Sequence, residues 1–436
     1  MSKKKKIRYA FKKDYEAPVK EFYPRDIYLP GRGIGKKVTV PDTMGEFERY
    51  KPLDYYKDLL RLCVKCGNCR YVFRDWNRAC PSGEFGGFES YYLGGKNVLL
   101  WGLTREKIKW SKPIVEVLYH CMLCGNCQVQ CQIPEIHHYA TEWLEAAREK
   151  AVELGIGPMP GQLKMGYHII KEHNPHMELH KKRLDWLPVS RESLPKKAEI
   201  AFFVGCTPSH VQTHIATATF EILKKLNVNF TILNDEYCCG SPAQQTGQRK
   251  IAIDCARHNA KELEKTGAST VVTSCPGCHK MLNEEYKKRY KLNLEAEIVH
   301  SSTFFNNLLK KGVLKFRNNI GKAITYHDPC HLGRYSGIYE DPRDLLQNMP
   351  GVKVIEMPRN KQNAWCCGGG GGVRAGFPGL SSFAASERVK EAKETGAEAI
   401  VSSCPFCYIN LSDAIEQYNE KMEVYDVVDL INMSIK

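Results

Sequence analysis

The stretch Cys366-Cys367-Gly368-Gly369-Gly370-Gly371-Gly372 places two adjacent cysteines in front of five consecutive glycines. A disulfide between adjacent cysteines strains the peptide that joins them, so the two thiols are poorly suited to bond with each other. They can instead both bind one large inorganic cluster. Further cysteines flank the pair, with 35 residues between Cys330 and Cys366 and a Cys-x-x-Cys motif at Cys404 and Cys407. This spacing predicts that five cysteines hold metal together.

The same layout occurs earlier in the chain. There, 31 residues separate Cys206 from the pair Cys238-Cys239, and a Cys-x-x-Cys motif follows at Cys275 and Cys278. Short apolar segments alternate with charged helical segments in both halves, which predicts a tandem repeat of an α/β unit with a largely parallel sheet. The predicted strands are 199–205, 228–233, 269–273 and 297–299 in the first half, and 323–326, 352–357 and 398–401 in the second. The cysteines follow the strands, where loops converge at the C-terminal edge of a parallel sheet.

Two more cysteine groups precede the repeats. The first is a Cys-x2-Cys-x2-Cys run with ten residues between it and a fourth cysteine, and the second is a Cys-x2-Cys-x2-Cys-x3-Cys run. Such runs wrap one corner of a [4Fe-4S] cubane, and in two-cluster ferredoxins the fourth cysteine crosses to the other cluster. On that pattern one cubane takes Cys63, Cys66, Cys69 and Cys131, and the other takes Cys121, Cys124, Cys127 and Cys80. The long insertions leave the crossover of Cys80 and Cys131 less fixed than the other ligands, and zinc is the alternative metal.

Composition favours a metal protein of a reducing compartment. The chain has 436 residues, 43% hydrophobic and 26% charged, which is ordinary for a soluble globular protein. Its nineteen cysteines come without a secretory signal or an apolar run long enough to span a membrane, so metal ligation explains them better than disulfides. We expect a cytoplasmic protein, either free or held at the cytoplasmic membrane face through a partner.

The net charge of +14 raises the question of a nucleic-acid partner. Four clusters ligated by thiolates would add about ten negative charges by formal counting, so the loaded protein would be only mildly basic. We therefore predict no nucleic-acid binding. The lysine run Lys3–Lys6 is interpreted as a solvated tail, with docking to an anionic surface as the alternative.

The predicted organisation is multidomain, with a helix-rich dicluster ferredoxin ahead of two α/β units. Its expected parts are a basic extended arm (1–50), the ferredoxin domain (51–155), a connector (156–195), and the two repeats (196–318 and 319–436). An amphipathic helix is expected over 135–154, with Glu142, Glu145, Arg148 and Glu149 away from its apolar face.

Three glycines beside the paired cysteines are candidate cofactor-binding positions. Gly240, Gly368 and Gly369 would let the backbone approach a bulky cluster and would permit positive φ. A phosphate-binding loop is excluded because no Gly-Lys-Ser/Thr follows. The remaining cysteine, Cys255, falls on a predicted helix and is expected to be a small buried side chain outside the metal sites.

These motifs, with Tyr326-His-Asp-Pro-Cys-His-Leu-Gly-Arg334 at the start of the second repeat, resemble the paired CCG domains of heterodisulfide reductase. The fused N-terminal ferredoxin resembles the catalytic D-type subunit of that family. The resemblance implies a noncubane [4Fe-4S] cluster in each five-cysteine motif, with a disulfide substrate cleaved between the two. The implied ligands are Cys206, Cys238, Cys239, Cys275 and Cys278 for one cluster, and Cys330, Cys366, Cys367, Cys404 and Cys407 for the other.

The resemblance predicts an iron–sulfur oxidoreductase that passes electrons through two cubanes to two noncubane clusters, which reduce a disulfide of the CoM-S-S-CoB type. His327 and His331 are candidate proton donors because imidazole titrates near neutral pH, although both could simply hold the loop. The sequence shows no flavin or nicotinamide site, so electrons are expected from a membrane cytochrome b-type subunit or a soluble flavoprotein.

Two other functions remain open at this point. Some relatives with CCG domains are electron-transfer subunits, which link a hydroxyacid oxidase, an electron-transferring flavoprotein or a benzoyl-CoA reductase-type complex to a quinone pool or another carrier. The third function is that of an interaction protein held together by zinc.

Overall fold

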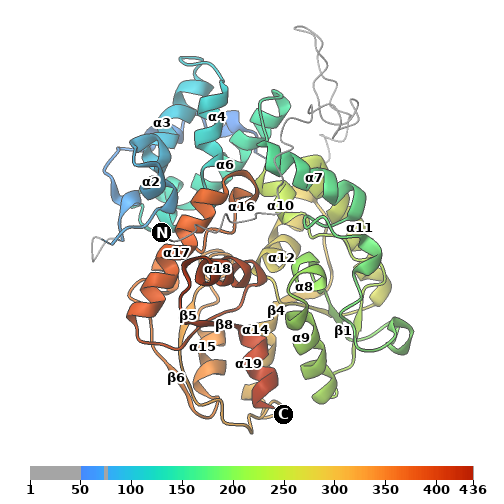
Figure 1. Ribbon diagram of the computed structural model, residues 1–436. Coiled ribbons are helices and arrows are strands. Elements are labelled where there is room, and N and C mark those ends of the chain that lie inside the picture. The colour runs from blue at the N-terminus through green and yellow to red at the C-terminus, as the bar shows by residue number, and fades with distance from the viewer. Residues whose placement is uncertain (1–50, 73–76, 436) are drawn as a thin grey trace, which may run out of the picture.

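The computed structural model describes residues 51–72 and 77–435 (Figure 1). The arm predicted for residues 1–50, with its lysine run, lies outside these residues. Within them, two four-stranded parallel sheets confirm the predicted tandem α/β repeat. The first sheet has the order β2-β1-β3-β4 and the second β6-β5-β7-β8. The strands are β1 (Ile200–Phe202), β2 (Phe230–Ile232), β3 (Thr270–Thr273), β4 (Glu297–His300), β5 (Lys322–His327), β6 (Val352–Val354), β7 (Ala399–Ser402) and β8 (Glu423–Asp426).

Strand β8 was not predicted from the sequence. It lies at the edge of its sheet, paired only with β7. Glu423 is exposed and the two central residues are only half-buried, so the segment lacks the continuous apolar run that marks the central strands. The other seven strands overlap their predicted segments.

The two repeats share one hydrophobic core. Phe202 and Val272 of the first sheet belong to the same buried cluster as Tyr326 and Val401 of the second, and Leu430 of α19 joins them. Helices α9 and α19 pack against each other, and both contribute residues to this cluster. The helices of the repeats are α8 (Cys206–His210), α9 (Thr213–Lys225), α10 (Ser241–Gln245), α11 (Arg249–Thr266), α12 (Pro276–Lys280), α13 (Tyr286–Tyr290), α14 (Ser301–Lys310), α15 (Glu340–Gln347), α16 (Val373–Gly376), α17 (Pro378–Glu394), α18 (Pro405–Tyr418) and α19 (Val427–Ser434).

The cysteines of both repeats follow the C-terminal ends of strands, as predicted. Cys275 and Cys404 come directly after β3 and β7 and occupy the N-cap positions of α12 and α18. In each case proline stands at the first helical position, where its missing N–H and fixed φ suit the start of a helix. The local sequence Cys-Pro therefore sets the residue at which each helix begins, and so places the cysteine just before it.

The ferredoxin region is helical and lies at one end of the molecule, beside α16 and α17 (Figure 1). Its helices are α2 (Pro81–Gly86), α3 (Leu93–Thr104), α4 (Lys112–Tyr119), α5 (Asn126–Val129) and α6 (Pro134–Glu153). The segment 156–195, predicted to be a connector, contains helix α7 (Pro160–Glu172). Gln162 of α7 donates from Nε2 to the Gly372 carbonyl at 3.0 Å, so this helix packs onto the glycine run.

Helix α6 confirms the predicted helix, and three of the charged residues away from its apolar face are buried as well. Glu145, Arg148 and Glu149 are 5%, 0% and 5% exposed. The helix is covered on that side by the repeats, because Glu145 pairs with Arg289 of α13 at 2.6 Å. The hydrophobic periodicity of α6 could not predict that its charged side would also be covered, because the repeats that cover it lie far away in the sequence.

Arg148 joins three separate parts of the chain. Its Nη1 donates to the carbonyls of Gln245 at 2.8 Å and Gly371 at 2.9 Å, and its Nη2 donates to the carbonyl of Cys121 at 2.7 Å. One buried guanidinium therefore holds the first repeat, the second repeat and the ferredoxin region together.

Among the described residues, none of the helices combines the length and the apolar character needed to cross a membrane.

We predict that Arg148→Met destabilises the protein by about 3 kcal/mol or more, because five carbonyls, those of Gln245, Gly371 and Cys121 among them, would lose this donor inside the molecule. Lys150→Met on the exposed side of the same helix is the matched control, since its ion pair with Glu153 is a surface pair worth less than about 1 kcal/mol. Melting followed by circular dichroism should show a clear drop for the first variant only. Equal melting temperatures for both variants would show that Arg148 does not hold the three parts together.

Candidate metal centre

A cavity of about 900 Å³ opens at the C-terminal edges of the two sheets. Nine of the ten cysteines of the repeats line it, and Cys238 is the exception. We call the five cysteines of the first repeat the first quintet and those of the second repeat the second quintet. Cysteines from two separate halves of the chain therefore face a common space.

The first quintet is a chain of thiols in mutual contact. The Sγ atoms of Cys206 and Cys238 are 3.9 Å apart. Hydrogen bonds from the thiols of Cys238 and Cys278 lower the pKa of Cys239 to about 5. Neighbouring thiols thus share protons, and a bound cation would take the place of those protons.

The second quintet is arranged in the same way. The Sγ atoms of Cys367 and Cys407 are 3.3 Å apart, and Cys366 hydrogen-bonds to both Cys330 and Cys367. The ligand atoms of His327, Cys367 and Cys407 all lie within 4.8 Å of one another.

The two quintets meet at one point. Cys275 of the first and Cys404 of the second hydrogen-bond to each other through their side chains. Each stands at the start of a helix, α12 or α18, where the positive end of the helix dipole favours a thiolate. The fold therefore brings the two predicted metal sites against each other.

We group the eight ferredoxin cysteines into two quartets, as the crossover pattern predicts. Burial raises the pKa of the Cys80 thiol to about 12, and the nearby charges of Cys121 and Cys124 add to this shift. Burial is also the main reason for the raised pKa of Cys131, to which the charges of Cys66 and Cys63 add. The fourth cysteine of each run thus lies beside the opposite run, which is the arrangement that the crossover pattern requires.

The second quartet (Cys80, Cys121, Cys124 and Cys127) adjoins the second quintet. A hydrogen bond with the thiol of Cys366 lowers the pKa of Cys124 to about 7. The ferredoxin region is therefore in direct contact with one of the two repeats through metal-binding side chains.

The glycines beside the paired cysteines allow close approach of neighbouring backbone segments as well as leaving room for a cofactor. Gly240 and Gly368 have φ of +92° and +86°, so the predicted positive φ is confirmed at both. A Cβ on Gly368 would lie 2.5 Å from the Ser381 carbonyl oxygen, and one on Gly371 would lie 2.3 Å from that of Cys121. Gly369 has no positive φ, and its Cβ would make an ordinary contact with the Cys367 sulfur at 3.6 Å. Much of the run is glycine because helix α17 and the Cys121 loop approach it so closely.

The two candidate proton donors lie in different surroundings. His327 is buried, and its Nδ1 accepts a hydrogen bond from Arg388 Nε at 3.0 Å. His331 lines the cavity, with Nδ1 3.6 Å from the Cys330 sulfur and Nε2 3.2 Å from Gln245 Nε2. Of the two, only His331 is placed to reach a molecule in the cavity.

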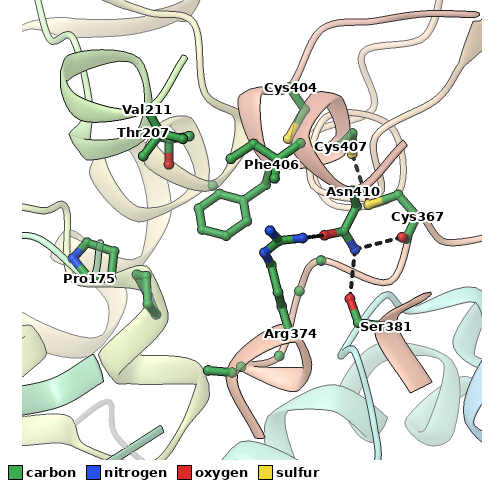
Figure 2. Close-up of a pocket in the computed structure, with 18 of the residues that line it drawn as sticks. Pro175, Thr207, Val211, Cys367, Arg374, Ser381, Cys404, Phe406, Cys407 and Asn410 are labelled. Carbon is green, nitrogen blue, oxygen red and sulfur yellow. Dashed lines mark hydrogen bonds between the residues drawn. The ribbon is translucent and has the colours of Figure 1, made fainter. Parts of the chain in front are cut away.

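The remaining wall of the cavity combines apolar side chains with charged ones, among them Lys164 and Arg374. Figure 2 shows Phe406, Val211 and Pro175 on this wall, with Arg374 directed toward Asn410. Arg374 donates to Asn410 Oδ1 at 2.6 Å and pairs with Asp413 at 2.7 Å. The cavity can therefore hold an organic molecule beside the thiols.

Sequence reasoning missed Lys96, a buried cationic side chain near the ferredoxin cysteines. Lys96 is 1% exposed, and its Nζ donates to Ser82 Oγ at 3.1 Å and to the Tyr91 carbonyl. Burial lowers the pKa of Lys96, and the charges of Cys121 and Cys80 oppose that effect. Its position in the sequence between the two ferredoxin cysteine runs carried no signal of this role.

These residues fit iron–sulfur clusters. All nineteen cysteines are free. Burial raises the pKa of Cys127 well above its usual value, and the charges of Cys80, Cys124 and Cys121 raise it further, so several thiolates in one place need a cation. Each quintet offers one thiol more than the four that a zinc ion takes. The buried Nη2 of Arg334, for which the described residues provide no acceptor, is a donor suited to a cluster sulfur.

Cys255 is buried at 4% exposure on α11, as predicted. We predict that Cys255→Ala leaves the iron content of anaerobically purified protein unchanged, whereas Cys239→Ala, a matched change in the first quintet, removes about four iron atoms. Iron and acid-labile sulfide would be measured per chain. A loss of iron in the Cys255 variant, or none in the Cys239 variant, would overturn this assignment.

Comparison with known proteins agrees with the site. Residues 200–283 and 324–412 match the family described as Cysteine-rich domain (CCG), and residues 59–133 match the 4Fe-4S dicluster domain. The D-type subunit of dihydromethanophenazine:CoB–CoM heterodisulfide reductase from Methanosarcina mazei is 39% identical over 85% of this chain and 92% of the relative. Its counterpart in Methanosarcina acetivorans is 36% identical over 86% of this chain and 93% of the relative.

A more distant relative is named for another activity. The B-type subunit of the CoM/CoB fumarate reductase of Methanothermobacter marburgensis is 27% identical over 89% of this chain and 75% of the relative. Both kinds of relative are parts of oxidoreductases. With its dicluster ferredoxin region, its two CCG repeats and its identity to the Methanosarcina proteins over most of both chains, the protein belongs to the family of heterodisulfide reductase D-type subunits, which are iron–sulfur oxidoreductases.

Proposed function

We propose that this chain carries the catalytic site of a reductase that cleaves a thiol-linked disulfide of the CoM-S-S-CoB type. The observation that carries this proposal is the shared cavity, in which both complete quintets meet at Cys275 and Cys404. The reaction takes two electrons and two protons, and the S–S bond becomes two thiols. A site with two metal-binding quintets around one space suits a substrate with two sulfurs.

The proposed cofactors are two cubane and two noncubane [4Fe-4S] clusters. The first quartet (Cys63, Cys66, Cys69 and Cys131) and the second quartet would hold the cubanes, and the quintets would hold the noncubane clusters. When bound, these clusters supply electrons one at a time. Gly240, Gly368 and Gly369 would leave room beside the quintets.

The proposed electron path runs from the surface to the cavity. Cys66 of the first quartet is exposed, whereas the cysteines of the second quintet other than Cys330 are buried. The contact between Cys124 and Cys366 supports a transfer from the ferredoxin region to the second repeat first. The proposed path thus runs from the first quartet to the second quartet and then, through Cys124 and Cys366, to the second quintet.

Proton delivery is assigned to His331. Its ring stacks on Tyr335 with centroids 5.1 Å apart, and Gln245 holds the nitrogen on the far side from Cys330. Imidazole so positioned can pass a proton to a thiolate in the cavity. His327, which is bonded to Arg388 and faces Cys367, is assigned a structural role.

The electron donor is proposed to be another protein, either a membrane cytochrome b-type subunit or a soluble flavoprotein. Such a partner would place the chain in the cytoplasm or on the cytoplasmic membrane face. The predicted division at residues 50, 155, 195 and 318 remains a prediction, and the core shared by the repeats suggests that 196–318 and 319–436 fold together.

The second candidate function is electron transfer without catalysis, in which the chain links a flavoprotein to a quinone pool or another carrier. The relative named as part of a CoM/CoB fumarate reductase is the observation behind it, because that name adds fumarate reduction to the same two thiols. The contact of Cys124 with Cys366 would serve this function equally well.

We predict that cluster-loaded protein oxidises reduced methyl viologen when the coenzyme M–coenzyme B heterodisulfide is added. Cys367→Ser should abolish turnover, because it removes a thiolate of the second quintet, and Cys255→Ser, the same change outside the quintets, should retain it. In the same assay His331→Gln should slow turnover by about tenfold or more at neutral pH, while viologen still reduces the clusters. Turnover and a pH profile equal to those of the wild type would remove His331 from proton delivery.

If the wild-type protein reduces neither this heterodisulfide nor other low-molecular-weight disulfides while all four clusters are present, the electron-transfer function is the better one. The four clusters would then be expected to re-oxidise with a quinone or a flavoprotein acceptor.

A further inference from the structure

Arg334 lies between the second quartet and the second quintet. Its Nε donates to the carbonyl of Cys124 at 2.7 Å, and its Nη1 donates to the carbonyls of Ala364 at 2.9 Å and Gln362 at 3.1 Å. Ala364 is two residues before Cys366. The guanidinium therefore fixes the loop of one metal-binding group relative to the loop of the other.

The third nitrogen of this side chain is available to a cluster. Nη2 of Arg334 is buried, and the described residues give it no hydrogen-bond acceptor. The negative groups that act most strongly on the guanidinium are the sulfurs of Cys124, Cys330 and Cys366. A buried charged donor without an acceptor is costly, so this N–H is expected to bond to a sulfur when the clusters are present.

We propose that Arg334 is a positioning residue that raises the reduction potential of the cubane in the second quartet, through its charge and through a hydrogen bond from Nη2 to a sulfur at this junction. The proposal rests on the proposed function, because it assumes the clusters assigned there. A nearby positive charge and hydrogen bonds to sulfur both stabilise the reduced, more negative state of a cluster. The electron would thereby collect beside the second repeat before it enters the cavity.

The first repeat has no arginine at the position that corresponds to Arg334. Four residues after Cys206, at the position that corresponds to Arg334 after Cys330, stands His210. Burial, together with the charges of His180 and Arg183, lowers the pKa of His210 to about 4, so this position carries no charge at neutral pH. The cation therefore belongs to the repeat whose quintet contacts a ferredoxin cysteine, Cys124.

The test is a redox titration of the second cubane in the cluster-loaded full chain, followed by electron paramagnetic resonance. Arg334→Gln should lower its midpoint potential by about 59 mV or more, which is a tenfold change in the one-electron equilibrium. Arg334→Lys should recover part of this shift because it keeps the charge. His210→Gln, the matched change in the first repeat, should leave the potential unaltered.

An Arg334→Gln variant with full iron content and an unmoved potential would overturn the proposal. If this variant loses iron, the wild-type protein labelled with ¹⁵N-arginine decides the question by pulsed electron paramagnetic resonance. Coupling of an arginine nitrogen to the reduced cubane supports the proposal, and its absence contradicts it.

The two proposals fail in different ways. A shifted potential in a protein that reduces no disulfide would keep the role of Arg334 and remove the reductase function. A wild-type protein without a second cubane signal would overturn both.

Discussion

The structure depends on one electrostatic constraint, which is that many thiolates must be gathered in a place largely closed to water. Buried thiolates repel one another and raise each other's pKa, so they need cations and donors around them. The parallel sheets direct the thiols to one edge, and the helix N-termini at Cys275 and Cys404 favour negative charge there. Arg148 and Lys96 place buried positive charge next to the Cys121 loop. The bound iron would supply the rest of the compensation.

The same constraint makes the molecule asymmetric. The two repeats have the same strand order, yet only the second receives a ferredoxin cysteine, Cys124, against its quintet. The glycine run exists on that side because the Cys121 loop leaves no room for a Cβ at Gly371. An internal duplication has thus been adapted, in our account, so that electrons arrive at one repeat and the substrate lies between both.

Features that depend on short stretches of sequence, such as metal-binding motifs and buried strands, could be predicted. The cysteine spacing and the apolar segments were enough to find both repeats and seven of the eight strands in the described residues, whereas β8 was missed because an edge strand needs few apolar residues. Arg148 was recognised only as a charged residue away from the apolar face of its helix, since its partners Gln245 and Gly371 are 97 and 223 residues away in the chain. Arg334 stood in a recognised motif, but its contact with Cys124 crosses 210 residues. Contacts between segments far apart in the chain determine whether such side chains are buried. The hydrophobic periodicity of one helix cannot predict those contacts.

The central claim is that one cavity holds two iron–sulfur clusters, one from each quintet. The most direct measurement is anomalous X-ray scattering at the iron edge from a crystal of the cluster-loaded protein. Our account predicts iron density at both quintets, on either side of the contact between Cys275 and Cys404, in addition to two sites in the ferredoxin region. Iron confined to the ferredoxin region, with an iron-free cavity, would contradict it.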